Sequence, residues 1–303
     1  MTADGGGWTA LPVPASLLGE SPFWHPDEAA LYWCDIPGRT LHRCPPADPA
    51  AHRSWTFDTE PACAAPLPGG DLLLAMRDGL FRFSPASGAR TRRAPPPYDP
   101  ADSRFNDGKA DALGRFWLGT VYEPRSAPNA ALYRCAAGRV DRMAGDATVA
   151  NGLAFSPDAR TLYWADTTSH RIDAFDFDLG AGTLSNRRVL ARFERKPADG
   201  DLAHYGGRPD GAAVDAEGAL WVAMFEGQRL VRLDAQGRLL QALPLPVRCP
   251  TMPCFGGADL RTLYVTTSRE KRPADELAAQ PLAGAVLARR VDVPGLPVNF
   301  ARV

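Results

Sequence analysis

Cysteine motifs that bind metals are missing from this sequence. The chain has six cysteines, but no C-x-x-C pair and no H-x-H spacing occur in it. These absences exclude the usual zinc site built on thiolates. Because a 303-residue chain without a secretion signal gives little support for disulfides, we expect all six thiols to be reduced and mostly buried. They are Cys34, Cys44, Cys63, Cys135, Cys249 and Cys254.

Signals for export, membranes and nucleic acid are also lacking. The first 30 residues show no basic start followed by an apolar core, and 18 apolar residues never run together. With 34 basic and 35 acidic residues the formal charge is -1, so no basic field exists to hold nucleic acid or an anionic membrane. We therefore expect a soluble cytoplasmic protein, a monomer or weak oligomer, without nucleic-acid or membrane partners.

Helical periodicity is a third absence. Only ADELAAQ, near residue 274, is a candidate for a short helix, so helical solenoids and α/β folds are disfavoured. No G-x-S-x-G motif occurs, which disfavours a serine nucleophile elbow. The 28 Gly and 29 Pro residues instead favour many tight turns.

What the chain does contain is an internal repeat of roughly fifty residues. Each copy has a polar or small start, a few small or apolar positions, an Asp/Gly/Pro turn and an apolar strand that usually carries aromatic residues. Five copies are ESPFWHPDEAALYWCDIPGRTLHRC from Glu20, NDGKADALGRFWLGT from Asn106, NGLAFSPDARTLYWADTTSHRIDAFDFD from Asn151, DGAAVDAEGALWVAMFEGQRLVRLD from Asp210 and PCFGGADLRTLYVTTS from Pro253. A weaker copy from Cys63 makes six.

The repeat predicts an all-β fold, a six-bladed β-propeller that forms one domain over residues 1–303. Each unit continues into a third strand of alternating apolar and polar residues, and turns follow every few residues. Six small antiparallel sheets fit a propeller better than a sandwich or a barrel. The N-terminal WTALPVPAS is expected to supply an outer strand to the last blade and so close the ring.

Four polar residues occupy one phase of the repeat, at the start of the expected inner strand: Glu20, Asn106, Asn151 and Asp210. In a propeller these side chains converge on the central channel, where two carboxylates and two amides suit Ca²⁺, Mg²⁺ or Mn²⁺. At the equivalent position we expect Cys63-Ala64 in the second blade and Pro253-Cys254 in the sixth. Asn-Gly and Asp-Gly pairs are also common turn formers, so a turn stays an alternative for Asn151 and Asp210.

Other charged residues are assigned to the scaffold. Turns between the first two strands are expected to contain Asp27, Asp111, Asp158, Asp215 and Asp259. Asp166 is a candidate buried partner near the axis, and Asp107 and Lys109 stay unassigned. The charged segments 192–196 and 269–272 are read as solvated loops.

The chain resembles the regucalcin and gluconolactonase family, also called senescence marker protein, along nearly its whole length. GESPFW, RFNDGKADALGRFWLGT, NGLAFSPD, PDGAAVDAEGALWVA and PCFGG occur in the order found in that family. The resemblance implies a propeller with one divalent metal ion in the channel that hydrolyses sugar-acid lactones. It implies Glu20, Asn151 and Asp210 as metal ligands, and Arg104, Asn106 and Glu123 as substrate-binding residues.

The residues that face the substrate are less well defined by this resemblance. Tyr122 is an alternative to Glu123, because the segment after Gly119-Thr120 varies in the family. The 197–209 segment is longer than usual, so His204 and Tyr205 either overhang the channel mouth or belong to a surface insertion.

The expected reaction is hydrolysis of an aldono-1,4- or 1,5-lactone. A metal ion polarises the carbonyl, Asp210 accepts the proton of the attacking water, Arg104 donates hydrogen bonds and Asn106 positions the lactone. Ca²⁺, Zn²⁺, Mn²⁺, Mg²⁺ and Fe²⁺ all stay possible. An organophosphate hydrolase on the same scaffold and a non-enzymatic calcium-binding propeller are the alternatives.

Overall fold

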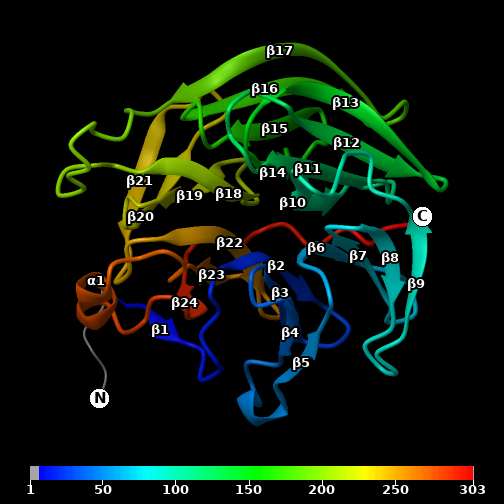
Figure 1. Ribbon diagram of the computed structural model, residues 1–303, viewed down its shortest axis with the longest axis horizontal. Coiled ribbons are helices and arrows are strands. Elements are labelled where there is room, and N and C mark those ends of the chain that lie inside the picture. Colours follow the sequence, from blue (N-terminus) through cyan, green and yellow to red (C-terminus); the bar gives the residue numbers. More distant parts are fainter. Residues whose placement is uncertain (1–6, 303) are drawn as a thin grey trace.

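In the computed structural model, which describes residues 7–302, the chain forms six four-stranded antiparallel sheets arranged in a ring (Figure 1). The predicted six-bladed propeller is therefore confirmed. The ends of the expected 1–303 domain, residues 1–6 and 303, lie outside the described residues.

Five blades are meanders of consecutive strands, and the sixth takes its outer strand from the N-terminal part of the chain; the strands are given from the channel outwards. The first three are β2 (Gly19–His25), β3 (Ala30–Asp35), β4 (Thr40–Cys44) and β5 (Arg53–Thr56); β6 (Pro61–Pro66), β7 (Leu72–Met76), β8 (Gly79–Phe83) and β9 (Arg90–Ala94); and β10 (Ser103–Ala110), β11 (Phe116–Tyr122), β12 (Ala130–Ala136) and β13 (Arg139–Ala147). The next two are β14 (Ala150–Phe155), β15 (Thr161–Asp166), β16 (Arg171–Asp178) and β17 (Thr183–Arg192), and β18 (Arg208–Val214), β19 (Leu220–Phe225), β20 (Arg229–Leu233) and β21 (Leu239–Pro244). The sixth is β22 (Pro250–Gly256), β23 (Thr262–Thr267), β24 (Leu287–Arg290) and β1 (Thr9–Ala10).

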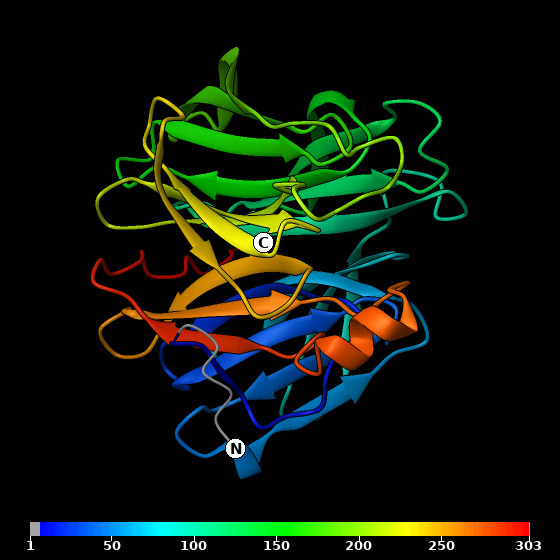
Figure 2. The same cartoon turned by 90° about the vertical axis from the view of Figure 1, so that its left-hand side faces the viewer.

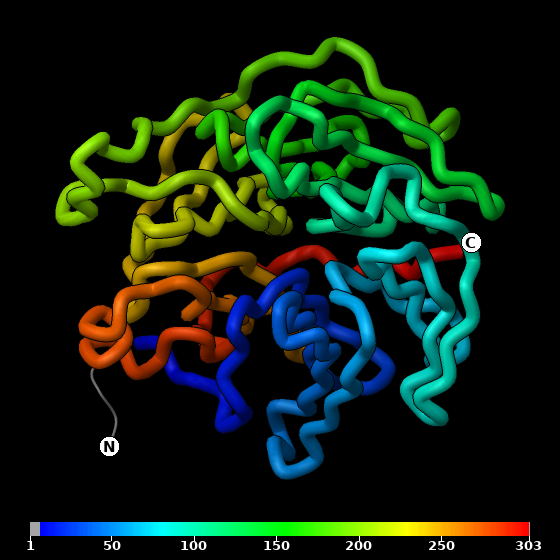
Figure 3. Tube along the Cα trace, viewed as in Figure 1, coloured from blue at the N-terminus to red at the C-terminus, as the bar shows by residue number. Residues whose placement is uncertain are grey.

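The core lies between neighbouring blades. The two strands nearest the channel are buried on both faces, as in β3, where all six residues of ALYWCD are buried. This is why these strands read as nearly continuous apolar runs, whereas the outer strand β17 is mostly exposed. A 3₁₀ turn (Pro49–Ala51) precedes β5, and Figure 3 traces the long 193–207 connection out from the ring.

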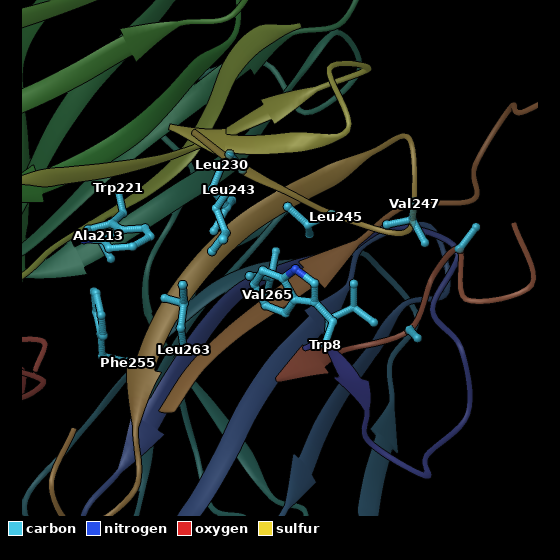
Figure 4. Packing of buried hydrophobic residues seen from close by; sticks show 14 residues of the cluster. Trp8, Ala213, Trp221, Leu230, Leu243, Leu245, Val247, Phe255, Leu263 and Val265 are labelled. Carbon is cyan, nitrogen blue, oxygen red and sulfur yellow. The ribbon is translucent and has the colours of Figure 1, made fainter. Parts of the chain in front are cut away.

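The first and last strands of the described chain pair in the sixth blade. Strand β1 pairs antiparallel with β24, with Thr9 opposite Ala288 and Ala10 opposite Leu287. The indole of Trp8 donates a 2.8 Å hydrogen bond to the carbonyl of Pro244 in the fifth blade. Figure 4 shows Trp8 packed among residues of both blades, including Val265. The N-terminal outer strand expected from WTALPVPAS is therefore confirmed, and it closes the ring.

The C-terminal segment crosses one end of the channel. It runs between the two halves of the ring in Figures 1 and 2. Its backbone is tied to four blades, through Gly295 to Asp215 and to Leu260, Ala301 to Pro66 and Arg302 to Gly114. The expected short helix is present as α1 (Ala274–Ala279). Within residues 7–302 no helix is long and apolar enough to cross a membrane.

The five turn aspartates lie between the first two strands of their blades, as expected. Two of them also hold the second strand in place. Asp215 is fully buried and accepts hydrogen bonds from the indole of Trp221 at 2.8 Å, from Arg232 at 2.8 Å and from two backbone amides. Asp111 accepts the equivalent bonds from Trp117 and Arg115. The aspartate and the tryptophan six residues later are thus one structural unit.

We predict that Asp215→Ala lowers the free energy of unfolding by about 3 to 5 kcal/mol, because buried donors lose their only acceptor. Asp259→Ala is the matched control, since Asp259 holds the same turn position but its side chain is 49% exposed. Urea denaturation measures both variants. Equal losses in the two variants would contradict the structural role given to Asp215.

Candidate functional site

A β-bulge at the start of the inner strand aims the polar side chains into the channel. The register shifts in all six inner strands of the described chain, for example between Glu20 and Phe23 and between Asn151 and Ala154. Asn106 lies within its bulge, and so does Asp210. Bulges change the direction of side chains and often border functional sites.

The glycines after Asn151 and Asp210 belong to these bulges and not to turns. Gly152 has a φ of 60°, and a Cβ there would lie 3.1 Å from the Asp210 carbonyl oxygen. A Cβ on Gly211 would lie 2.4 Å from the Cβ of Met252 on the next inner strand. The alternative in which Asn-Gly and Asp-Gly simply form turns is therefore wrong, since close packing of inner strands requires these glycines.

The positions assigned to the second and sixth blades need correction. The bulge falls between Pro61 and Cys63 in β6 and between Pro250 and Met252 in β22. Ala62 and Thr251 therefore stand at this phase, instead of Cys63-Ala64 and Pro253-Cys254. The hydroxyl of Thr251 donates to the carbonyl of Gly19 at 2.5 Å, which links the sixth blade to the first.

Two carboxylates, Glu20 and Asp210, are buried at the centre with 6% and 5% of their surface exposed. Burial raises the pKa of Glu20 well above its usual value, and the carboxylates of Asp210 and Asp107 raise it further. Burial also raises the pKa of Asp210 to about 8, although the guanidinium of Arg208 opposes this. No Lys, Arg or His nitrogen of residues 7–302 lies within 4 Å of either carboxylate.

The two amides lie beside these carboxylates in one hydrogen-bonded chain. Asn106 donates to the side-chain oxygen of Asn151 at 2.6 Å, and Asn151 donates to the hydroxyl of Thr167 at 2.8 Å. Thr167 in turn donates to the carbonyl of Pro209 at 2.7 Å. Arg104, largely buried, donates to the side-chain oxygen of Asn106 at 2.7 Å. The side-chain oxygen of Asn151 thus accepts a hydrogen bond from Asn106, and Asn151 lines the same cavity as the two carboxylates.

A cavity of about 620 Å³ opens above these residues, and Glu20, Arg104, Asn106, Asn151 and Asp210 all line it. It occupies the end of the channel where the inner strands begin. Glu123 lines it too and receives an ion pair from Arg77 at 2.8 Å, while Arg104 lies 3.5 Å away. The cavity has the size expected for a small-molecule site.

Tyr122 and His204 are not among the residues that line this cavity. Tyr122 is the last residue of β11 and packs against the apolar cluster around Trp117. Because successive side chains of an extended chain alternate in direction, Glu123 points to the opposite side. His204 is exposed on the 193–207 connection, whereas Tyr205 is buried beside His170. Of the two alternatives at 122 and 123, the cavity geometry favours Glu123.

Several cavity residues had no signal in the repeat, among them Arg125, Arg208 and Glu226. The 269–272 segment, expected to be a solvated loop, contributes Arg272 to the wall, with only 11% of its side chain exposed and an ion pair to Glu226 at 2.8 Å. From 192–196, Lys196 also pairs with Glu226, at 2.9 Å. In the sequence, only the opposite charges of these loops could have indicated such pairs, and the spacing of the repeat does not show which loops meet.

Asp107 and Lys109, which the sequence left unassigned, and Asp166, expected near the axis, all form hydrogen bonds with the backbone. Asp107 is buried below the cavity and accepts from the amide of Leu153 at 2.8 Å, and Lys109 donates to the carbonyl of Ala212 at 2.9 Å. Asp166 accepts from the amides of Thr148 and Val149, so it fixes the chain entering β14 instead of pairing at the axis.

Comparisons with known proteins identify the family of this chain. A family model described as the SMP-30/Gluconolactonase/LRE-like region matches residues 18–269. The chain belongs to the SMP-30/gluconolactonase family. It is 43% identical over 281 residues to 6-deoxy-6-sulfogluconolactonase of Pseudomonas putida, covering 92% of this chain and 93% of that protein. It is 33% identical over 288 residues to regucalcin of Oryctolagus cuniculus, covering 92% and 93%.

A solved structure of the same family has the same fold. The calcium-binding protein regucalcin from Agrobacterium tumefaciens superposes with a TM-score of 0.90 at 28% identity, covering 98% of this chain and 97% of that one. This chain therefore shares its overall fold with that protein.

The raised pKa values predict an unusual pH dependence of stability for the metal-free protein. A carboxyl whose pKa rises on folding binds more protons in the folded state, so the free energy of unfolding falls as pH rises from the unfolded value near 4 to about 8. The slope is at most about 1.4 kcal/mol per pH unit for each such group. With chelator present, Asp210→Asn should reduce the slope and be more stable than the parent at pH 8. Thermal or urea unfolding across this range measures it, with Asp259→Asn as control, and a flat parent profile would refute it.

Proposed function

We propose that this protein is a lactonase that hydrolyses a sugar-acid lactone, with one divalent cation held by Glu20, Asn151 and Asp210. The observation that carries this proposal is the pair of buried carboxylates at the base of the cavity, which lack a cationic side chain in contact. Burying a carboxylate without a partner is costly, so a bound cation is the natural counter-charge.

The donor set fits a divalent cation. Two carboxylates and one amide oxygen are hard oxygen ligands with a combined charge of -2, and the cavity leaves room for further ligands. Among residues 7–302 no group of three or more His, Cys, Asp or Glu side chains is arranged to hold a metal. The proposed ligands are of mixed carboxylate and amide type, which does not distinguish Ca²⁺, Zn²⁺, Mn²⁺, Mg²⁺ and Fe²⁺. When bound, such a cation supplies a Lewis acid for the lactone carbonyl and favours ionisation of water.

Asp210 is the proton acceptor in this proposal. Its carboxyl group is buried and lines the cavity, so it lies where a water molecule that attacks the lactone could pass it a proton. Water adds to the carbonyl carbon, its proton passes to Asp210, and the bond from that carbon to the ring oxygen breaks. The proton then goes to the departing ring oxygen, which becomes the hydroxyl of the open-chain acid.

Arg104 and Asn106 are proposed to orient the lactone beside Asp210. The guanidinium of Arg104 is fixed by the carbonyl of Phe105 at 2.9 Å and by Asn106, and it faces Glu123. A planar guanidinium held in this way can donate paired hydrogen bonds to sugar hydroxyls or to a developing oxyanion. Glu123, held by Arg77, offers an acceptor to a sugar hydroxyl on the same side.

The comparisons support lactones as the substrate class. The Pseudomonas putida relative is named for a gluconolactone that carries a sulfo group on carbon 6. We therefore include sugar lactones with an acidic substituent in the proposed class.

Removal of the metal should abolish the activity. After treatment with chelator, the rate of acid release from glucono-1,5-lactone should fall by at least about 100-fold, because the carbonyl loses its Lewis acid. Re-addition of Ca²⁺, Zn²⁺, Mn²⁺, Mg²⁺ or Fe²⁺ in separate samples should restore it and rank the ions. Asp210→Asn should remain inactive with every ion. Full activity in chelator would rule the mechanism out, and hydrolysis of a phosphotriester alone would favour the organophosphate alternative.

Arg104→Lys tests the role of the guanidinium. It keeps the charge but loses the paired donors, so kcat/KM should fall by about 10- to 100-fold. Arg93→Gln on the outer strand β9 is the control for the loss of a charged side chain far from the cavity. Unchanged kinetics in Arg104→Lys would show that only charge is needed there.

A further inference from the structure

The wall of the cavity carries nearly balanced charges once Glu20 and Asp210 are set aside. Its basic side chains are Arg104, Arg125, Arg208, Lys271 and Arg272, and its remaining acidic ones are Glu60, Glu123, Glu226 and Glu270. Five basic and four acidic groups differ by one positive charge. Which basic group is left over depends on how they pair.

Each of the four acidic side chains already has a partner. Arg77 binds both Glu60 and Glu123, at 2.7 and 2.8 Å. Glu226 receives Arg208 at 3.1 Å and Arg272 at 2.8 Å, as well as Lys196 from outside the wall. Glu270 receives Lys271 at 3.1 Å.

Three of the basic side chains are held still by these contacts. Arg272 forms ion pairs with two carboxylates, because it contacts Glu276 at 2.6 Å as well as Glu226. Arg208 lies over the ring of Phe225 with 5.0 Å to its centre. Arg104 is fixed through Asn106 and the Phe105 carbonyl. These guanidiniums therefore shape the wall, and their charges are largely balanced within it.

Arg125 differs from all of them. Among residues 7–302, its guanidinium has no carboxylate within 4 Å and no hydrogen-bond acceptor. Its backbone amide donates to the carbonyl of Tyr122 at 3.1 Å in a tight turn, which places the residue just beyond the end of β11. It is close enough to Asp210 to favour the charged form of that carboxyl, yet it does not touch it. A ligand group can therefore occupy the space between them.

We propose that Arg125 selects lactones that carry a terminal oxyanion, a sulfonate or a phosphate, on the carbon farthest from the carbonyl. This inference deepens the proposed function and rests on it. With the ring carbonyl at Asp210, the far end of a six-carbon lactone extends towards the rim, where Arg125 is the one basic wall residue without a partner among the described residues. A guanidinium presents paired donors that match such oxyanions.

Kinetics with three lactones test this role. The substrates are glucono-1,5-lactone and its 6-sulfo and 6-phospho counterparts, assayed with the metal-loaded enzyme. Arg125→Gln should lower kcat/KM for the preferred acidic lactone by about 10- to 100-fold, mainly through KM, because one charge-assisted contact is lost. The neutral lactone should change by less than about 2-fold. The two acidic lactones distinguish a sulfonate from a phosphate as the preferred oxyanion.

Two controls make the outcome decisive. Arg93→Gln removes an exposed charge from the outer strand β9 and should leave all three substrates unaffected. Arg125→Lys should recover part of the lost selectivity. Equal effects of Arg125→Gln on neutral and acidic lactones, or no effect on either, would overturn the proposal.

A binding measurement separates this inference from the reaction itself. Calorimetry compares the open-chain 6-sulfo and 6-phospho acids with gluconate, on the parent and on Arg125→Gln. The parent should prefer one acidic ligand, and the variant should lose that preference. If the parent turned over no lactone but this difference persisted, the proposed reaction would fail while the role of Arg125 would stand. If the variant bound all three ligands as the parent does, the role of Arg125 would fail.

Discussion

The burial of two like charges, Glu20 and Asp210, at the axis of a ring is the constraint on which the site depends. Taking a carboxylate out of water costs several kcal/mol even after relaxation, and each carboxylate here makes the other harder to ionise. The chain meets this cost in part with the guanidiniums of Arg104, Arg125 and Arg208, which act from a distance. In the proposed function, direct contact is supplied by a bound divalent cation. The cost of burying these carboxylates is thus the basis of the proposed ligation.

The bulge is what makes this arrangement possible within a regular repeat. A strand without a bulge would turn successive side chains to its two faces, and both faces of an inner strand pack against neighbouring blades. The register shifts directly after Glu20 and Asn151, which are the last paired residues before the bulge, and both side chains line the cavity. Small neighbours are then required, which explains Gly152 and Gly211 better than turn chemistry does. The scaffold and the site therefore share the same few positions.

The repeat made the fold and the central residues predictable from sequence, because equivalent positions must converge when blades are arranged in a ring. Glu20, Asn106, Asn151 and Asp210 do come together beside the cavity. In the sixth blade the predicted position was wrong, because neither Thr251 nor Met252 is charged or small enough to indicate a bulge. Only the strand register locates the bulge there. His204 was misplaced for a related reason. No periodicity governs the direction of a long connection, so its side chains cannot be assigned to the mouth of the channel.

The division between strands and connections also explains how one chemical centre can serve different substrates. The residues at the base, Glu20, Asn151 and Asp210, lie on inner strands that pack on both sides, so any change there disturbs two blades. Arg125, by contrast, follows the end of β11 and is exposed. Its side chain has no partner among the described residues, so a substitution there would leave no other group unpaired. A change at such a position alters the rim and removes no direct contact of the buried carboxylates, although Arg125 favours the charged form of Asp210 from a distance. If Arg125 selects the substrate as proposed, selectivity can vary at the rim while the buried carboxylates are retained.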